Sequence, residues 1–272
     1  MISSLMLVVG VGVLSVGLRS FQTPVLFRLG TFGLVATSFL AGWLLGESVA
    51  LGVVFASTWF LLPWLEILTR VRRMRLPLHR SLEKCPPPPA SHFPGFGELS
   101  DELEAMDFEY VDDVNWRHED TRHFYRLFYC AAKRTAGAIC LVEHDGVSFY
   151  YASFSSRTAD GRIFLTWNYP FSYGMHPLPR TVMNRIDGMP GIKELADEHE
   201  VFLAARTNGE NDLVQSDCAT LRDEVERDLK LQIEHNIDKG ILARDGEEMI
   251  RYSLRGMFFL WTQFLREFVR LS

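Results

Sequence analysis

Three apolar runs open the chain and decide its architecture: Ile2–Leu18 (ISSLMLVVGVGVLSVGL), Leu29–Gly46 (LGTFGLVATSFLAGWLLG) and Val49–Leu65 (VALGVVFASTWFLLPWL). None of these runs contains a charged residue, and the first charge after the third run is Glu66. Each run has the length of a short membrane span, since about 20 apolar residues cross a hydrocarbon core of about 30 Å. An unpaired backbone is not tolerated in lipid, so we expect three transmembrane helices, at about 2–18, 29–46 and 49–66.

The first run has one alternative interpretation, a cleaved signal peptide. A signal peptide carries positive charge before its apolar core and a small-x-small cleavage site after it. No lysine or arginine precedes this run, and Val16, Gly17 and Leu18 lead directly into Arg19. The sequence therefore favours a first transmembrane span.

Positive residues predict the orientation of the spans. Arg19 and Arg28 flank the first connection, whereas the second connection, at 46–48, has no cation. A cluster follows the third run, and we expect it to contact lipid headgroups: Arg70, Arg72, Arg73 and Arg75. Three spans place both arginine groups on one side of the membrane, and positive residues mark the cytoplasmic side. We therefore expect a multi-pass protein of the cell membrane with a short external N-terminus and a soluble domain in the cytoplasm.

Composition divides the chain into a membrane domain at 1–69, a basic and proline-rich linker at 70–97, and a soluble domain at 98–272. Residues 1–89 carry eight Lys+Arg against three Asp+Glu, whereas residues 90–272 carry twenty against thirty-one. The basic part suits anionic lipid headgroups, and the acidic part argues against nucleic-acid binding through phosphate contacts. The run Pro86–Pro89 predicts a semi-rigid spacer or a docking site for a proline-binding partner.

The soluble domain is predicted to be α+β, with an antiparallel β-meander of four or five strands packed by C-terminal helices. Strands are expected at 123–130, 138–143, 147–156 and 162–168, with a fifth at 108–111. In the first of these, Phe124 and Phe128 lie on one face and Tyr125 and Tyr129 on the other. Asp145-Gly146 and Asp160-Gly161 favour tight turns between strands. Helical spacing of apolar residues predicts helices at 98–106, 190–206, 217–236 and 244–269.

The last of these helices has two interpretations. Its apolar residues trace one broad face that includes Met257, Phe258 and Trp261, while Arg251, Arg255, Arg266 and Arg270 make it basic. Such a helix either covers the sheet as part of the core, or it lies in the membrane interface or on the spans.

Signatures of catalysis are absent from the sequence. It contains no phosphate-binding loop, no dinucleotide fingerprint, no zinc-ligand spacing and no nucleophile motif, so it implies no cofactor and no metal. The remaining cluster follows the meander and forms a possible ligand pocket: Asn168, Tyr173, His176, Arg180 and Asn184. The alternative is that Pro177 and Pro179 rigidify a surface crossing.

Two function classes remain. The leading hypothesis is a binding or accessory component of a membrane complex, with membrane lipids and another protein as partners and without enzymatic activity. The alternative is a membrane-associated enzyme that acts on a lipid or headgroup substrate through the loop at 168–184.

Overall fold

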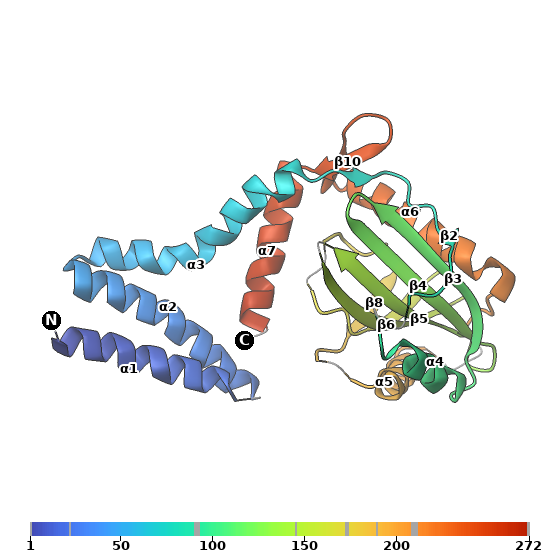
Figure 1. The fold of residues 1–272 in the computed structure, drawn as a ribbon, viewed down its shortest axis with the longest axis horizontal. Helices are drawn as coiled ribbons and strands as arrows, with labels where there is room; N and C mark the ends of the chain where they lie inside the picture. The colour runs from blue at the N-terminus through green and yellow to red at the C-terminus, as the bar shows by residue number, and fades with distance from the viewer. Residues whose placement is uncertain are drawn as a thin grey trace.

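The structure is a computed structural model that describes residues 2–21, 23–89, 93–144, 146–171, 174–188, 190–207 and 212–270. The three apolar runs form three long helices, α1 (Ile2–Arg19), α2 (Pro24–Gly46) and α3 (Val49–Thr69) (Figure 1). All three are long and apolar enough to cross a membrane. The prediction of three such helices is confirmed. The second begins five residues earlier than expected, because Pro24 is compatible with the first turn of a helix.

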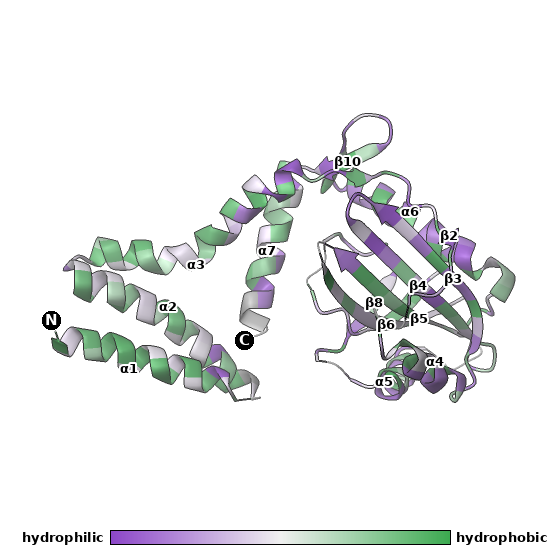
Figure 2. Cartoon of the chain, viewed as in Figure 1, coloured by the Kyte–Doolittle hydropathy of each residue, from purple (hydrophilic) through white to green (hydrophobic). Residues whose placement is uncertain are grey.

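Apolar residues dominate α1, α2 and α3, as Figure 2 shows. Many of them are exposed, including Val13, Phe32 and Leu62. Soluble proteins rarely expose apolar surface of this extent, so these helices need a nonaqueous surrounding. The structure therefore supports a membrane protein.

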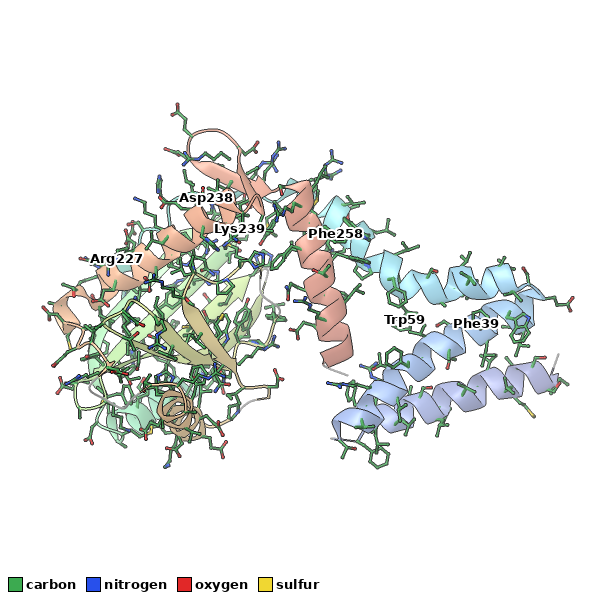
Figure 3. The ribbon with its side chains drawn as sticks, turned by 180° about the vertical axis from the view of Figure 1, so that it is seen from behind. Phe39, Trp59, Arg227, Asp238, Lys239 and Phe258 are labelled. Carbon is green, nitrogen blue, oxygen red and sulfur yellow. The ribbon has the colours of Figure 1, made fainter. Side chains whose placement is uncertain are left out.

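Small and polar residues bring the three helices together. A Cβ atom on Gly33 would lie 2.2 Å from the Ser15 hydroxyl oxygen, so α1 and α2 are in close contact there. Between α2 and α3, the Trp59 indole nitrogen donates a hydrogen bond of 2.8 Å to the Ser38 hydroxyl. Figure 3 shows Phe39 and Trp59 on these two helices. The spans thus form two consecutive helical hairpins.

A seven-stranded sheet forms the centre of the soluble domain, in the order β2-β3-β4-β5-β6-β7-β8. Neighbouring strands are antiparallel except for β7 and β8, which are parallel. The strands are β2 (Glu83–Lys84), β3 (Glu109–His118), β4 (Thr121–Cys130), β5 (Thr135–His144), β6 (Val147–Arg157), β7 (Ile163–Trp167) and β8 (Thr181–Arg185). The predicted α+β class with its meander is confirmed. Strands β2 and β8 extend the sheet beyond the prediction.

Helices cover both faces of this sheet, because side chains alternate along each strand. On one face, Phe124 and Phe128 of β4 pack with residues of α4 (Phe96–Glu104) and α5 (Ile192–Ala204). On the other face, Tyr125 and Tyr129 of the same strand pack with residues of α6 (Leu221–Asp238). The alternation expected for this strand therefore separates two cores.

A second, smaller sheet connects the membrane helices to this domain. It contains β1 (Leu76–Pro77), β10 (Met249–Tyr252) and β9 (Leu242–Arg244), in that order. The helix predicted from residue 244 is therefore wrong at its start, and α7 spans Leu254–Arg270. The reason is a tight turn at Asp245-Gly246, where Gly246 has a φ of +90° that glycine adopts without strain.

The segment expected to be a linker takes part in both sheets. It contributes β1 to the small sheet and β2 to the large one, and Leu78 and Leu82 between them are buried. The backbone nitrogen of Cys85 also donates a hydrogen bond to the Asp113 carbonyl, at 3.0 Å. The proline run at 86–89 therefore follows an edge strand of the sheet.

One histidine lies in the core and should make stability depend on pH. His199 of α5 is 1% exposed, and its ring nitrogens lie 2.9 Å from the Thr166 hydroxyl and 3.2 Å from the Ser156 hydroxyl. Burial lowers the pKa of His199 to about 4, so the ring is neutral at pH 7. In the unfolded chain the His199 ring has a pKa of about 6.5. Between pH 6.5 and pH 4 the unfolded chain therefore binds a proton at His199 that the folded chain does not bind. His199 should therefore contribute a fall in stability of up to roughly 3 kcal/mol as the pH drops from 6.5 to 4.

Denaturation of the full chain in neutral detergent at pH 7 and pH 4.5 measures this effect. His199→Gln should lose less stability between the two pH values than the unsubstituted protein. His144→Gln changes an exposed ring and serves as the control. Equal losses in the protein and in His199→Gln would contradict the assignment.

Candidate functional site

A cavity of about 250 Å³ lies between the large sheet and α6. Its floor contains two cross-strand pairs of small residues, Ala138 with Ser153 and Ala136 with Ser155, on β5 and β6. All four side chains point to the face that α6 covers. On β6, for example, Ser153 and Ser155 alternate with Ala152 and Phe154, which belong to the core on the other face of the sheet. Val225, Leu229 and other side chains of α6 line the opposite wall. Short side chains opposite a helix leave a space that larger residues would fill.

One end of the cavity carries an ion-paired group. The Arg157 Nε atom lies 3.3 Å from a Glu224 carboxylate oxygen, and the same guanidinium is paired with Asp228. The Ser216 hydroxyl donates a further hydrogen bond of 3.2 Å to Glu224. Both acids therefore already have cationic partners. This end fixes α6 to β6, and its carboxylates are not free to act as a general base.

Buried aromatic residues line the other end. Burial raises the pKa of Tyr125 to about 12, and it also raises the pKa of the Cys140 thiol to about 12. Tyr151 shares side-chain hydrogen bonds with both groups. All three are therefore protonated at pH 7, and Cys140 is not an activated nucleophile. Tyr151 and Arg157 are six residues apart on β6, so the cavity extends for roughly 20 Å along the strand.

Of the residues predicted to form a pocket at 168–184, the four that the structure describes do not converge. The Asn168 side chain accepts a hydrogen bond of 2.7 Å from the Ala152 backbone nitrogen and so joins β7 to β6. Asn184 lies on β8 in register with Thr166 of β7. Each asparagine thus has a position in the sheet.

The other predicted residues of this loop have separate surroundings. Arg180 has a φ of +66° and donates a hydrogen bond of 2.9 Å to the Asp160 carbonyl. The His176 backbone nitrogen donates to the Asn236 side chain on α6, at 2.8 Å, and the His176 ring packs against Phe259. Tyr173 lies outside the described residues. The four described polar residues of this prediction therefore have structural roles, whereas Pro177, Leu178 and Thr181 of the same segment line the cavity under α6.

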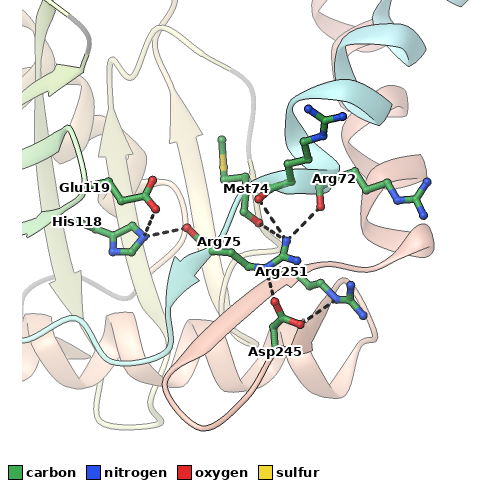
Figure 4. Close-up of polar contacts among 8 residues, drawn as sticks. Arg72, Met74, Arg75, His118, Glu119, Asp245 and Arg251 are labelled. Carbon is green, nitrogen blue, oxygen red and sulfur yellow. Dashed lines mark hydrogen bonds and ion pairs between the residues drawn. The ribbon is translucent and has the colours of Figure 1, made fainter.

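Of the arginines after α3, Arg75 forms its contacts with other residues of the chain. Its guanidinium is paired with Asp245 in the β9–β10 turn, and it also donates to the carbonyls of Arg72 and Arg73 (Figure 4). His118 Nε2 lies 2.9 Å from the Arg75 carbonyl oxygen. Arg75 therefore joins the end of the third span to the small sheet and to β3.

The other three arginines of the predicted headgroup-binding cluster are exposed. Arg70 forms an ion pair of 3.1 Å with Glu66, one helical turn earlier. No ion pair joins the side chain of Arg72 or Arg73 to another residue of the described chain. These two guanidinium groups are therefore the ones available to an anionic surface.

The last helix packs against the spans, which decides between its two interpretations. The rings of Trp64 on α3 and Trp261 on α7 stack with centroids 5.8 Å apart, and Phe258 contacts both. The Trp261 indole nitrogen donates a hydrogen bond of 2.9 Å to the Phe60 carbonyl, close to Pro63 inside α3. Figure 1 shows α7 running across the ends of the spans, beside the sheet domain. Its other side reaches the small sheet through Phe259.

Comparison with known proteins gives no relative to argue from: no family model, curated protein or solved structure matches the chain. Within the described residues, no group of three or more His, Cys, Asp or Glu side chains could hold a metal ion. The cavity under α6 is therefore the candidate functional site. Sequence reasoning missed it, although the small residues at 136, 138, 153 and 155 are its signal.

Proposed function

We propose that the chain is a multi-pass membrane protein whose sheet domain faces the cytoplasm and binds an apolar ligand beneath α6, without catalysing a reaction. The observation that carries this proposal is the cavity, with its floor of small residues and its aliphatic wall. A volume of about 250 Å³ is at the lower end for ligand pockets, which suits one narrow apolar molecule. The spans keep the domain beside a reservoir of such molecules, the bilayer.

The positions of the arginines support the orientation. Arg19 and Arg28 lie at the end of the α1–α2 hairpin, and the arginines after α3 lie at the same end of the spans as the sheet domain (Figure 1). The α2–α3 turn, with Glu47, lies at the opposite end. Positive residues mark the cytoplasmic side, so the sheet domain is assigned to the cytoplasm.

The enzyme alternative has less support. It depended on a shared site for the polar residues of the loop at 168–184, and the four described ones have separate structural partners. The ionisable groups at the two ends of the cavity are ion-paired or held protonated by burial. Binding is therefore the function that this geometry favours.

Filling the cavity should abolish ligand binding. Ala138→Phe places a ring over Ser153, its cross-strand neighbour, in the space that the ligand would occupy. Membranes containing the full-length protein are treated with a long-chain fatty acid that bears a photoreactive diazirine, and the labelled peptides are mapped by mass spectrometry. In the variant, the phenylalanine ring fills the cavity and leaves no room for the fatty acid. We therefore expect labelling of the α6 peptide that contains Val225 and Leu229 to fall about tenfold.

The same experiment contains two controls. Labelling of α1, α2 and α3 should not change, because lipid reaches these helices directly. Ala131→Phe places the same ring at an exposed turn and should label like the unsubstituted protein. If α6 is not labelled in the unsubstituted protein, or if Ala138→Phe labels it equally, the cavity is not a binding site for apolar chains.

A further inference from the structure

A cationic side chain without an acidic partner lies near the membrane end of the domain. Arg80 follows β1, and its guanidinium carbon lies 4.8 Å from the centre of the Trp116 ring. Its Nε atom is buried and has no hydrogen-bond partner. Three tyrosines surround it (Tyr125, Tyr151 and Tyr252), but burial raises the pKa of each of them, so they are neutral at pH 7. No carboxylate of the described chain forms an ion pair with Arg80. A buried cation without a counter-charge is costly, which points to an anion that binds there.

His123 presents a second unpaired nitrogen at the same place. Its ring stacks on Trp116, with centroids 4.2 Å apart and planes within 10°, so Trp116 is near both groups. The Nδ1 atom of His123 is buried and also lacks a hydrogen-bond partner. Burial and the charge of Arg80 lower the pKa of His123 to about 4, so the ring is neutral at pH 7. Unsatisfied buried polar atoms are rare in native proteins, and two of them beside Trp116 call for a shared explanation.

An open hollow adjoins Arg80 at the edge of the sheet. Strand β3 would be the edge of the large sheet but for β2, which pairs with it only at Val114 and Asn115. Beyond these two residues, the chain between β1 and β2 runs beside β3 without a strand pairing. The hollow measures about 370 Å³, and its lining includes Arg80, Arg117, His79, Ser81, Asn115 and the exposed acid Glu83. Its polar lining thus combines two guanidinium groups with hydroxyl, amide and imidazole groups.

We propose that this hollow binds a phosphate group, with Arg80 as its principal ligand and Arg117 as the second. A guanidinium donates two parallel hydrogen bonds to a phosphate, and the charge of two guanidinium groups balances that of a doubly charged phosphate. Ser81, Asn115 and His79 supply further hydrogen-bonding groups, more than a carboxylate requires. This site is separate from the cavity under α6 and does not depend on the proposed apolar ligand.

Two sources could supply the phosphate, a lipid headgroup or a soluble phosphate compound. In the sequence, Arg80 follows Arg72 and Arg73, the exposed arginines at the end of the third span, by eight and seven residues. Two titrations of the full-length protein in neutral detergent distinguish the sources, one with inorganic phosphate and one with dihexanoyl phosphatidic acid. Hexanoate at the same ionic strength serves as the carboxylate comparison. Isothermal titration calorimetry measures each affinity.

We expect one phosphate probe to bind per chain and Arg80→Gln to weaken its binding at least about tenfold, as the loss of a charge-assisted pair predicts. Arg117→Gln, a change on the exposed surface, should weaken binding without affecting folding, which keeps the test valid if Arg80→Gln is unstable. Arg206→Gln removes an exposed arginine after α5, outside the hollow and on the face of the sheet opposite α6. It should leave the affinity within about twofold, since exposed charges act weakly across a screened distance.

The pattern across the probes decides the outcome. Binding of phosphatidic acid alone supports the site and identifies a lipid headgroup, whereas binding of both probes supports it and identifies a soluble phosphate. The proposal is overturned if neither probe binds, if hexanoate binds as tightly as the phosphates, or if Arg206→Gln weakens binding as much as Arg80→Gln does.

Discussion

Asp113→Ala is expected to lower the free energy of unfolding by about 3–5 kcal/mol, the cost of leaving a buried charge unpaired. The two Asp113 carboxylate oxygens accept hydrogen bonds from Arg126 Nε and Nη2, at 2.8 Å and 2.7 Å. Asp113 is 4% exposed, and the Arg126 guanidinium also lies over the Phe96 ring of α4. This pair joins β3, β4 and α4, so its loss affects the packing of one face of the sheet.

Denaturation of the full chain in neutral detergent, followed by tryptophan fluorescence, measures this loss. Asp223→Ala is the matched control, because Asp223 pairs with Arg222 on the exposed surface of α6 at 3.0 Å. Exposed pairs contribute about 0–1 kcal/mol, so the control should change little. A loss below about 1 kcal/mol in Asp113→Ala would show that the buried pair does not support the sheet.

Gly256→Ala should displace the last helix from its position beside the third span. A Cβ atom on Gly256 would lie 2.0 Å from the Ile241 carbonyl oxygen, which is backbone and cannot move aside as a side chain would. The first turn of α7 would have to shift, and Trp261 would then lose its contact with Trp64. We expect a loss of about 3 kcal/mol in the free energy of unfolding, at the upper end for overpacking.

Gly97→Ala provides the comparison for this change. Gly97 lies in α4, and a Cβ atom there meets nothing within 4 Å. The same substitution should therefore be neutral or stabilise the protein by up to about 1 kcal/mol, because alanine favours helix. Limited proteolysis should cleave α7 faster in Gly256→Ala and at the original rate in Gly97→Ala. Equal cleavage rates and stabilities would contradict the close contact at Gly256.

Local patterns in the sequence predicted much of the fold. Hydropathy located the three long helices, and the alternation of Phe124 and Tyr125 assigned two faces to β4. The four-residue spacing from Leu221 to Ile233 likewise marked the buried face of α6. In each case the signal is the spacing of apolar residues within one helix or strand. That spacing can be read without knowing which other elements pack against it.

The errors arose where distant segments meet. Strand β8 pairs in parallel with β7 across an irregular connection, and the β9–β10 hairpin is completed by β1 from the other end of the chain. The hairpin did have a local signal in Asp245-Gly246, which the helical pattern around it obscured. The contact of Trp261 with Trp64 joins segments almost 200 residues apart, and no periodicity reports such a pair.

The candidate site depends on register in the same way. Ala136 and Ala138 appear ordinary in the sequence, as do Ser153 and Ser155. Only the pairing of β5 with β6 places these four side chains together opposite α6. Arg80 was likewise read as part of a basic linker, because its aromatic surroundings come from β3, β4, β6 and β10.

Cysteine labelling in intact cells tests whether the spans cross the membrane and leave the sheet domain in the cytoplasm, as we propose. One cysteine replaces Glu47 in the α2–α3 turn or Glu247 in the β9–β10 turn, both exposed. Cys85 and Cys218 are changed to serine, and the remaining Cys130 and Cys140 are buried. A membrane-impermeant maleimide should label position 47 in intact cells and position 247 only after permeabilisation. Labelling of position 247 in intact cells, with position 47 protected, would contradict the account.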